Sequence, residues 1–161
     1  MVRVSKRKKA LLDANLLLPY LIQHLGIDIE KFERTKNFTQ EDVQLLNDLV
    51  MQFGGLCATP HVITEVSNLA GKLRDNQTEP FRILLAHYIK TVGEFSIPSN
   101  ELILSPIYYK FGVTDAALFA ICQREKIVLV TLDFPLANYA EKNKLAVINF
   151  NHRRPKLWGI S

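Results

Sequence analysis

Apolar and polar positions divide the chain into short apolar runs and longer segments with helical spacing. The run "KIVLVTLD", residues 126–133, is apolar almost throughout, which is typical of a strand buried on both faces. The pattern predicts further strands over residues 8–13, 56–60 and 145–150. It predicts helices over residues 16–25, 40–53, 61–74, 80–92, 114–125 and 134–143.

Capping residues and prolines set the expected boundaries of these elements. Thr39 and Thr114 are suitable N-cap residues for the helices that follow them. Residues 94–109 contain Pro98 and Pro106, and we expect this segment to be extended and broken at both prolines. Residues 27–38 are expected to form a charged, irregular connection.

Strands and helices alternate along most of the chain, which predicts the α/β class. We expect a three-layer α/β/α fold with a mainly parallel central sheet of about 4–5 strands. A single domain spans residues 1–161, with its core over 8–150, a basic N-terminal arm over 1–9 and a basic C-terminal tail over 151–161. The extra helix within residues 27–60 departs from simple alternation.

The net charge of +4 is unevenly distributed. The first nine residues carry five basic groups and no acids, whereas residues 10–151 carry 12 basic residues against all 16 acids. This distribution suits a molecule that holds a polyanion at its edges and a cation at its centre. Arg153, Arg154 and Lys156 in the tail are candidates for contacts with a nucleic-acid phosphate backbone, and short solvated tails are the alternative interpretation.

Several classes of protein are disfavoured by composition. No apolar stretch is long enough to cross a membrane, and Asp13 and Asn15 interrupt the first apolar run, which argues against a signal peptide. Cys57 and Cys122 lie far apart in apolar surroundings and are expected to be reduced, which favours a cytoplasmic protein. The four histidines have no metal-ligand spacing, and we expect them on helix surfaces or satisfied in the interior.

Four carboxylates are placed where a parallel sheet gathers functional groups. Asp13 and Asp133 each end a predicted strand, and the carboxyl ends of neighbouring parallel strands meet at one edge of the sheet. Asp115 lies in line with the apolar face of its helix, and Glu65 lies at the border of such a face. Three of them have a structural alternative: a helix N-terminal acid for Asp115, a solvated boundary residue for Glu65, and a turn residue for Asp133. Asp13, flanked by apolar residues on both sides, is the hardest to explain in this way.

Four acids that converge repel one another unless a cation lies between them. Oxygen ligands without cysteine or histidine suit a hard cation, so we expect Mg²⁺ or Mn²⁺. Asn15 and Thr131 are placed to hydrogen-bond these carboxylates, and ordinary turn and strand chemistry is the alternative for both. Such a metal site suits hydrolysis of a phosphodiester.

The four acids lie in segments that resemble the motifs of the PIN domain family of metal-dependent nucleases. These segments are "LLDANLLL", "VITEVSNL", "GVTDAALFAIC" and "LVTLDFPLA", in this order along the chain. The resemblance implies that Asp13, Glu65, Asp115 and Asp133 are the catalytic and metal-binding quartet, supported by Asn15 and Thr131. It implies an endoribonuclease that leaves a 3′-hydroxyl and a 5′-phosphate.

The segment around residues 27–55 and the two basic ends depart from the common PIN pattern, so the substrate and the cellular role stay open. RNA is the expected substrate. A toxin blocked by an antitoxin, another protein partner and a homodimer are all compatible with the resemblance. A PIN-like RNA- or protein-binding module without catalytic activity is the alternative function.

Overall fold

The central sheet of this computed structural model has five parallel strands in the order β3-β2-β1-β4-β5. The structure describes residues 7–154. The strands are β1 (Ala10–Leu12), β2 (Leu56–Ala58), β3 (Gly93–Glu94), β4 (Val128–Thr131) and β5 (Val147–Asn149). β1, β2, β4 and β5 each lie within one of the four predicted strands and are shorter than it, whereas β3 was not predicted.

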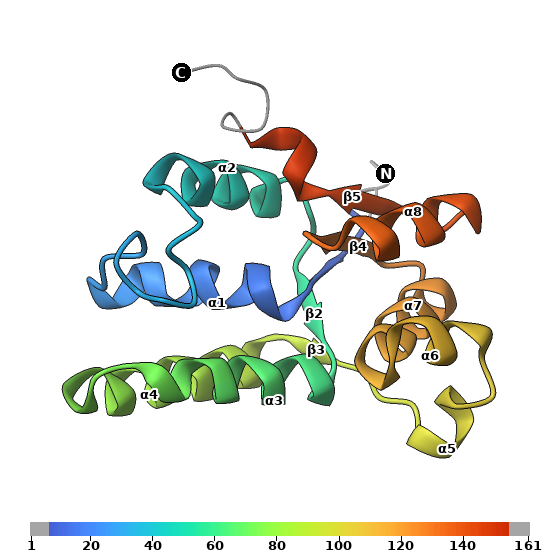
Figure 1. Ribbon diagram of the computed structural model, residues 1–161, viewed down its shortest axis with the longest axis horizontal. Helices are drawn as coiled ribbons and strands as arrows, with labels where there is room; N and C mark the ends of the chain where they lie inside the picture. The colour runs from blue at the N-terminus through green and yellow to red at the C-terminus, as the bar shows by residue number, and fades with distance from the viewer. Residues whose placement is uncertain (1–6, 155–161) are drawn as a thin grey trace, which may run out of the picture.

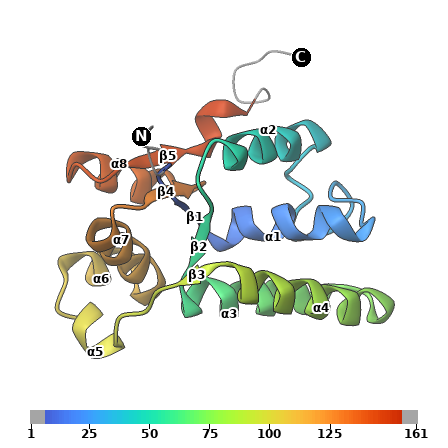
Figure 2. The ribbon, with the colours of Figure 1, turned by 180° about the vertical axis from the view of Figure 1, so that it is seen from behind.

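Helices cover the sheet on both sides. The first group consists of α1 (Ala14–Ile22), α2 (Gln40–Met51), α3 (Pro60–Leu69) and α4 (Asp75–Thr91). The second consists of α5 (Ser99–Leu102), α6 (Pro106–Phe111), α7 (Val113–Glu125) and α8 (Phe134–Lys142). Short 3-10 helices are η1 (Gln23–Leu25), η2 (Ala70–Lys72) and η3 (Phe150–Arg153). The two groups lie on opposite sides of the strands in both views (Figure 1, Figure 2), so the predicted three-layer α/β/α fold is confirmed.

The order in which strands are added to the sheet changes direction between β1 and β4, although all five strands are parallel. From β1 it moves outward through β2 to β3, then returns to place β4 on the other side of β1 and continues to β5. Leu11 pairs with Leu129 and Leu12 with Val130, so β1 and β4 are direct neighbours. In parallel α/β sheets the crevice at the carboxyl ends of two such strands is the usual ligand site.

The middle of the sheet is buried on both faces. Leu11, Leu12, Leu129 and Val130 are at most 1% exposed, and helices pack against each side of them. Because both faces are covered, the two strands read as continuous apolar runs rather than as alternating patterns. This burial explains why β1 and β4 could be located from the sequence.

Residues 94–109 are not extended as predicted, because they contain the two short helices α5 and α6. Pro106 is the first residue of α6, where a missing backbone N–H costs nothing, and Ser105 caps this helix. The expected N-cap Thr114 was also wrong, since α7 begins one residue earlier, at Val113, after Gly112. The first error arises because proline is compatible with both a break and the first position of a helix.

The inserted segment packs on α1. Gln23 and Asn47 exchange two side-chain hydrogen bonds of 2.8 and 2.7 Å, which tie the end of α1 to α2. Thr39 caps α2 as predicted, in a capping box with Asp42. The Thr35 hydroxyl donates to the Ile29 carbonyl at 2.8 Å and closes the preceding connection. The insertion is therefore an ordered part of the same domain.

Cys57 and Cys122 are both buried free thiols, in agreement with the sequence-based expectation. Over residues 7–154, no helix combines the length and the apolar character that a membrane crossing requires.

Candidate functional site

Asp13 joins the carboxyl ends of β1 and β4. Its side chain is the N-cap of α1, where Oδ1 accepts a hydrogen bond from the Leu16 amide at 3.0 Å. Its Oδ2 accepts from the Thr131 hydroxyl at 2.5 Å and from the Leu132 amide at 2.9 Å. The residue is only 9% exposed. Three donors therefore hold this carboxylate in one orientation in the crevice where the chain reverses.

Thr131 links Asp13 to the second strand-end acid. Its hydroxyl donates to Asp13 and accepts a hydrogen bond from the Asp133 amide at 3.0 Å. The Asp133 side chain caps α8, with Oδ1 accepting from the Leu136 amide at 2.8 Å. Asn15 is exposed on the first turn of α1, and within residues 7–154 it forms no hydrogen bond to a carboxylate. The structure thus contains the expected contact of Thr131 and lacks that of Asn15.

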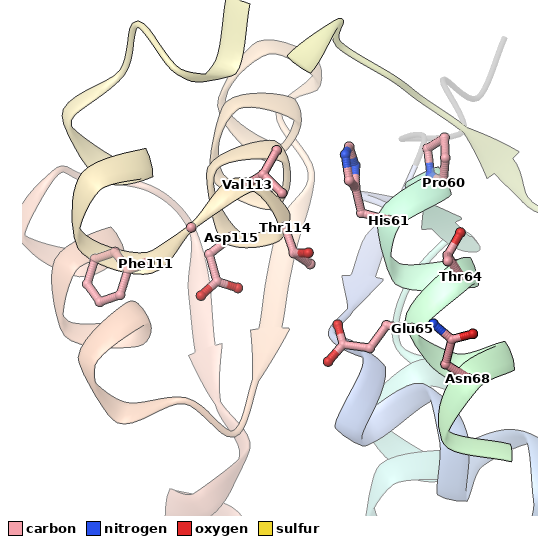
Figure 3. Close-up of a pocket in the computed structure, with 10 residues that line it drawn as sticks. Pro60, His61, Thr64, Glu65, Asn68, Phe111, Val113, Thr114 and Asp115 are labelled. Atoms are coloured by element: carbon pink, nitrogen blue, oxygen red, sulfur yellow. The ribbon is translucent and has the colours of Figure 1, made fainter. Parts of the chain in front are cut away.

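Glu65 and Asp115 face each other across a pocket of about 590 Å³ between α3 and α7. Figure 3 shows both carboxylates directed into the space between the two helices. One wall is formed by α3, and the other by residues 111–115 at the junction of α6 and α7. Within the described part of the chain, neither carboxylate accepts a hydrogen bond or forms an ion pair. Their oxygens are free for a ligand.

The four carboxylates interact electrostatically, and these interactions affect the pKa of Asp115 and Asp13. The pKa of Asp115 is raised to about 7, chiefly by burial. The negative charges of Asp133, Asp13 and Glu65 raise it further, in that order. Burial also raises the pKa of Asp13, against the opposing effect of its hydrogen bond from Thr131. No lysine or arginine is found among the described residues that line the pocket, so the negative charges are not neutralised there.

The carboxylate oxygens of this site are ligands that suit a hard cation, although the four side chains do not converge on one point. In the part of the chain that the structure describes, no three His, Cys, Asp or Glu side chains lie close enough together to hold a metal ion. Glu65 and Asp115 offer unpaired oxygens on opposite walls, and Asp13 is fixed by its hydrogen bonds. Mg²⁺ and Mn²⁺ keep several water ligands and need only one or two protein carboxylates, so the residues present fit such an ion.

Four further residues on the pocket walls were not identified from the sequence as site residues. His61 and Asn68 lie on α3 four residues before and three residues after Glu65, on the same face of the helix, and Thr64 directly precedes Glu65. His61 was expected on a surface or satisfied in the interior. Instead, its Nδ1 is buried and has no hydrogen-bond partner in the described structure. Phe111 supplies an apolar surface on the opposite wall. Helical spacing from Glu65 was the signal that could have revealed the α3 residues.

The basic C-terminal residues have different surroundings. Arg153 is exposed at the end of η3. Arg154 is turned inward, where it donates to Asp42 at 3.1 Å and to the Asn37 carbonyl and lies 4.8 Å from the centre of the Phe38 ring. Its guanidinium therefore holds the C-terminal segment onto the inserted segment. Lys156 lies outside the described residues.

Comparisons with known proteins bear on the fold. No family model and no curated protein matches the chain. The chain is similar to the solved crystal structure of PAE2754 from Pyrobaculum aerophilum, with a TM-score of 0.51 at 18% sequence identity. The similarity covers 81% of this chain and 84% of that chain. At this level of identity the likeness concerns the arrangement of the elements.

Proposed function

We propose that the chain is a PIN-like, divalent-metal-dependent nuclease that hydrolyses phosphodiester bonds in RNA as an endoribonuclease. The observation that carries the proposal is the grouping of four carboxylates near the carboxyl edge of a parallel sheet, where burial and then the charges of the other three raise the pKa of Asp115 to about 7. Two of them, Glu65 and Asp115, have free oxygens directed into one pocket. The choice of RNA rests on the resemblance of the sequence motifs.

Glu65 and Asp115 would hold Mg²⁺ or Mn²⁺ from opposite walls, with Asp13 and Asp133 contributing negative charge from the strand ends. When bound, such an ion stabilises negative charge on a phosphodiester and lowers the pKa of water. Thr131 fixes Asp13, so that this carboxylate needs no reorientation when an ion arrives. The charge of the ion would also favour the ionised form of Asp115 at neutral pH.

The start of α7 supports binding of the phosphate. Gly112 precedes this helix and has no side chain to cap it, so the amides of its first turn, in residues that line the pocket, have no side-chain capping group. Helix N-termini favour anions through their free N–H groups and the helix dipole. Phe111 beside it offers an apolar surface for a sugar or base. Together these features would offset the repulsion between the acidic residues and the phosphate chain.

Cleavage of a 5′-labelled RNA oligonucleotide in the presence of Mn²⁺ tests the proposal. The wild-type chain should cut the RNA, and Asp115→Asn and Glu65→Gln should each lower the rate by about 100-fold or more. Glu79→Gln on α4, an exposed carboxylate away from the pocket, is the matched control and should cut at the wild-type rate. Unchanged cleavage by Asp115→Asn would overturn the assignment of the site.

The alternative is a PIN-like RNA- or protein-binding module without catalysis. It is favoured by one observation: no three described acidic, histidine or cysteine side chains lie within reach of one metal ion. A module of this kind would retain RNA on a filter yet bind no Mn²⁺ at millimolar concentration. The nuclease proposal requires both metal binding and cleavage.

A toxin role in the cytoplasm belongs to the same proposal as a separate claim about biology. Induced expression of the wild-type chain should then arrest growth, and Asp115→Asn should not. Growth at the normal rate with an active nuclease would exclude the toxin role and leave the chemistry intact.

A further inference from the structure

A second pocket lies at the opposite edge of the sheet, where β1, β2 and β3 begin. Its volume is about 330 Å³. Lys9 directly precedes β1, Gly55 directly precedes β2, and Gly93 is the first residue of β3, and all three line the pocket. Because the strands are parallel, this edge is distant from the edge that carries Asp13. The pocket is therefore separate from the proposed nuclease site.

Tyr88 lines this pocket and carries an unpaired hydroxyl. The residue lies on α4, lines the pocket and is only 7% exposed. Its hydroxyl is buried and has no hydrogen-bond partner among residues 7–154. Burial raises the pKa of this phenol strongly, so the group stays protonated and can donate a hydrogen bond. Buried hydroxyls are nearly always paired, so the position calls for an acceptor that the described chain does not supply.

Lys9 supplies a positive charge at the same place. Its Nζ would lie 3.9 Å from a Cβ built on Gly93. It also lowers the pKa of the neighbouring Cys57 thiol, against the larger effect of burial. Lys9 forms no ion pair within the described part of the chain. Tyr20, half-buried on α1, lines the pocket beside these groups and offers a second phenol.

Three glycines line the pocket, and each is constrained for a different reason. A Cβ at Gly54 would lie 2.7 Å from the carbonyl oxygen of Arg7, too close for any other residue without a backbone shift. Gly55 has a φ of +140°, a conformation that side chains rarely adopt. At Gly93 a Cβ would fill space between the Cys57 sulfur and the Lys9 amine. Of the three glycines, Gly93 is therefore the one where a side chain would enter the space beside Lys9.

We propose that this pocket binds a small organic carboxylate. The Lys9 amine and the two phenols are donors that suit a carboxylate group. Val50, Leu56 and Val92 provide apolar walls for the body of the ligand. None of the described lining residues is acidic, so nothing on the walls repels an anion. A ligand that contacts both the donors and the apolar walls needs a charged carboxylate group and an apolar body.

Benzoate is a suitable probe, with benzyl alcohol as its neutral counterpart and inorganic phosphate as an anion without an apolar body. Each is titrated into the ¹⁵N-labelled full chain while the amide signals of Gly54, Gly55 and Gly93 are followed. Benzoate should give saturable shifts at these glycines, and the other two probes should bind at least about tenfold more weakly. Equal or tighter binding of phosphate would overturn the choice of a carboxylate.

Variants separate a built site from a water-filled hollow. Lys9→Met and Tyr88→Phe should each weaken benzoate binding by about tenfold, since each removes one donor while keeping most of the side-chain volume. Lys142→Met, an exposed lysine on α8, should bind benzoate as the wild type does. If no probe shifts the glycine signals at about 10 mM, or if both pocket variants bind normally, ordered water is the only occupant and the proposal fails.

Discussion

Thr131 is a small side chain on which two of the four acids depend. It is fully buried, and its hydroxyl donates a hydrogen bond to Asp13 and accepts one from the Asp133 amide. It therefore holds the end of β1 against the turn after β4. In a crevice that gathers negative charge, such a contact favours the ionised form of Asp13. The residue acts through the carboxylate that it orients.

Thr131→Val tests this contact. Valine has nearly the same shape but leaves one donor fewer on Asp13 and no acceptor for the Asp133 amide. We expect the free energy of unfolding to fall by about 1–3 kcal/mol, measured by urea denaturation at neutral pH. Thr131→Ser keeps the hydroxyl and should lose less than half of that amount. Equal losses in the two variants would show that packing, not the hydrogen bond, is what matters.

Asp115 makes the stability of the metal-free chain dependent on pH. Its folded pKa of about 7 is above the ordinary value of 3.8, so the folded state binds more protons than the unfolded state between these values. Stability contributed by this group is therefore complete below about pH 4 and is lost as the pH rises through 7. The raised pKa of Asp13 acts in the same direction.

Asp115→Asn removes this charge. Without metal, at about pH 8, the variant should be more stable than the wild type by about 1–2 kcal/mol, after allowance for the partial exposure of the side chain. The difference should vanish near pH 4, as measured by urea denaturation. Glu79→Gln is the control and should change little at either pH. A variant less stable than the wild type at pH 8 would contradict the buried-charge account.

The junction between α6 and α7 places Asp115. Gly112 has φ of +89° and ψ of −178°, a backbone conformation open mainly to glycine, and Asp115 follows three residues later. A Cβ at Gly112 would meet nothing within 4 Å, so space does not decide the residue there. The backbone conformation alone requires the glycine, and it sets the direction in which α7 begins.

Gly112→Ala should accordingly cost about 1–3 kcal/mol in the free energy of unfolding, because alanine disfavours this backbone region. Gly71→Ala is a matched control. Gly71 also has free space around it but lacks the unusual φ, so alanine there should be neutral or slightly stabilising. Urea denaturation of both variants gives the comparison. If Gly112→Ala and Gly71→Ala have similar free energies of unfolding, the backbone conformation at Gly112 does not require glycine.

The helices and strands of the core could be predicted because burial imposes a pattern on them. The run that forms β4 is apolar almost throughout, and Thr39 caps α2 through a local interaction with Asp42. Local signals failed where one residue type serves two purposes. Pro106 was taken as a break, but proline at the first position of a helix is favourable, and α6 begins there.

Contacts between distant parts of the chain decided the site. Asp13 and Asp133 lie at the same edge of the sheet because β1 pairs with β4. This long-range pairing had to be assumed in the sequence analysis. Glu65 and Asp115 face each other only because α3 and α7 pack near each other from opposite sides of the sheet. The place of His61 beside them depends on the same packing. Residue types were readable from the sequence, whereas their mutual distances required the fold.

Arg154 connects two distant parts of the molecule through a buried ion pair. It pairs with Asp42, which is fully buried, and so connects the C-terminal segment to the insertion between β1 and β2. Asp42 also completes the capping box of α2. A residue that resembled part of a basic RNA-binding tail is thus a connection between two segments that are far apart in sequence.

Arg154→Ala leaves the buried Asp42 without its cation. We expect a loss of about 1–3 kcal/mol in the free energy of unfolding, because the remaining carboxylate is buried with part of its interactions gone. Arg153→Ala changes the neighbouring exposed arginine and should alter stability by less than about 0.5 kcal/mol. Thermal melts of the two variants suffice for the comparison. Equal melting temperatures would exclude the structural role of Arg154.

The central claim is that Glu65 and Asp115 hold a divalent cation, with Asp13 and Asp133 adding negative charge nearby. Calorimetric titration of the full chain with Mn²⁺ at about pH 7, in two buffers with different ionisation enthalpies, tests it most directly. The account predicts binding at or below about 1 mM with release of protons, since Asp115 is partly protonated at this pH and ionises when the ion binds. It also predicts that Asp115→Asn and Glu65→Gln weaken binding by at least about tenfold while Glu79→Gln does not. Absence of binding at about 10 mM Mn²⁺, or binding that is unchanged in Asp115→Asn, would contradict it.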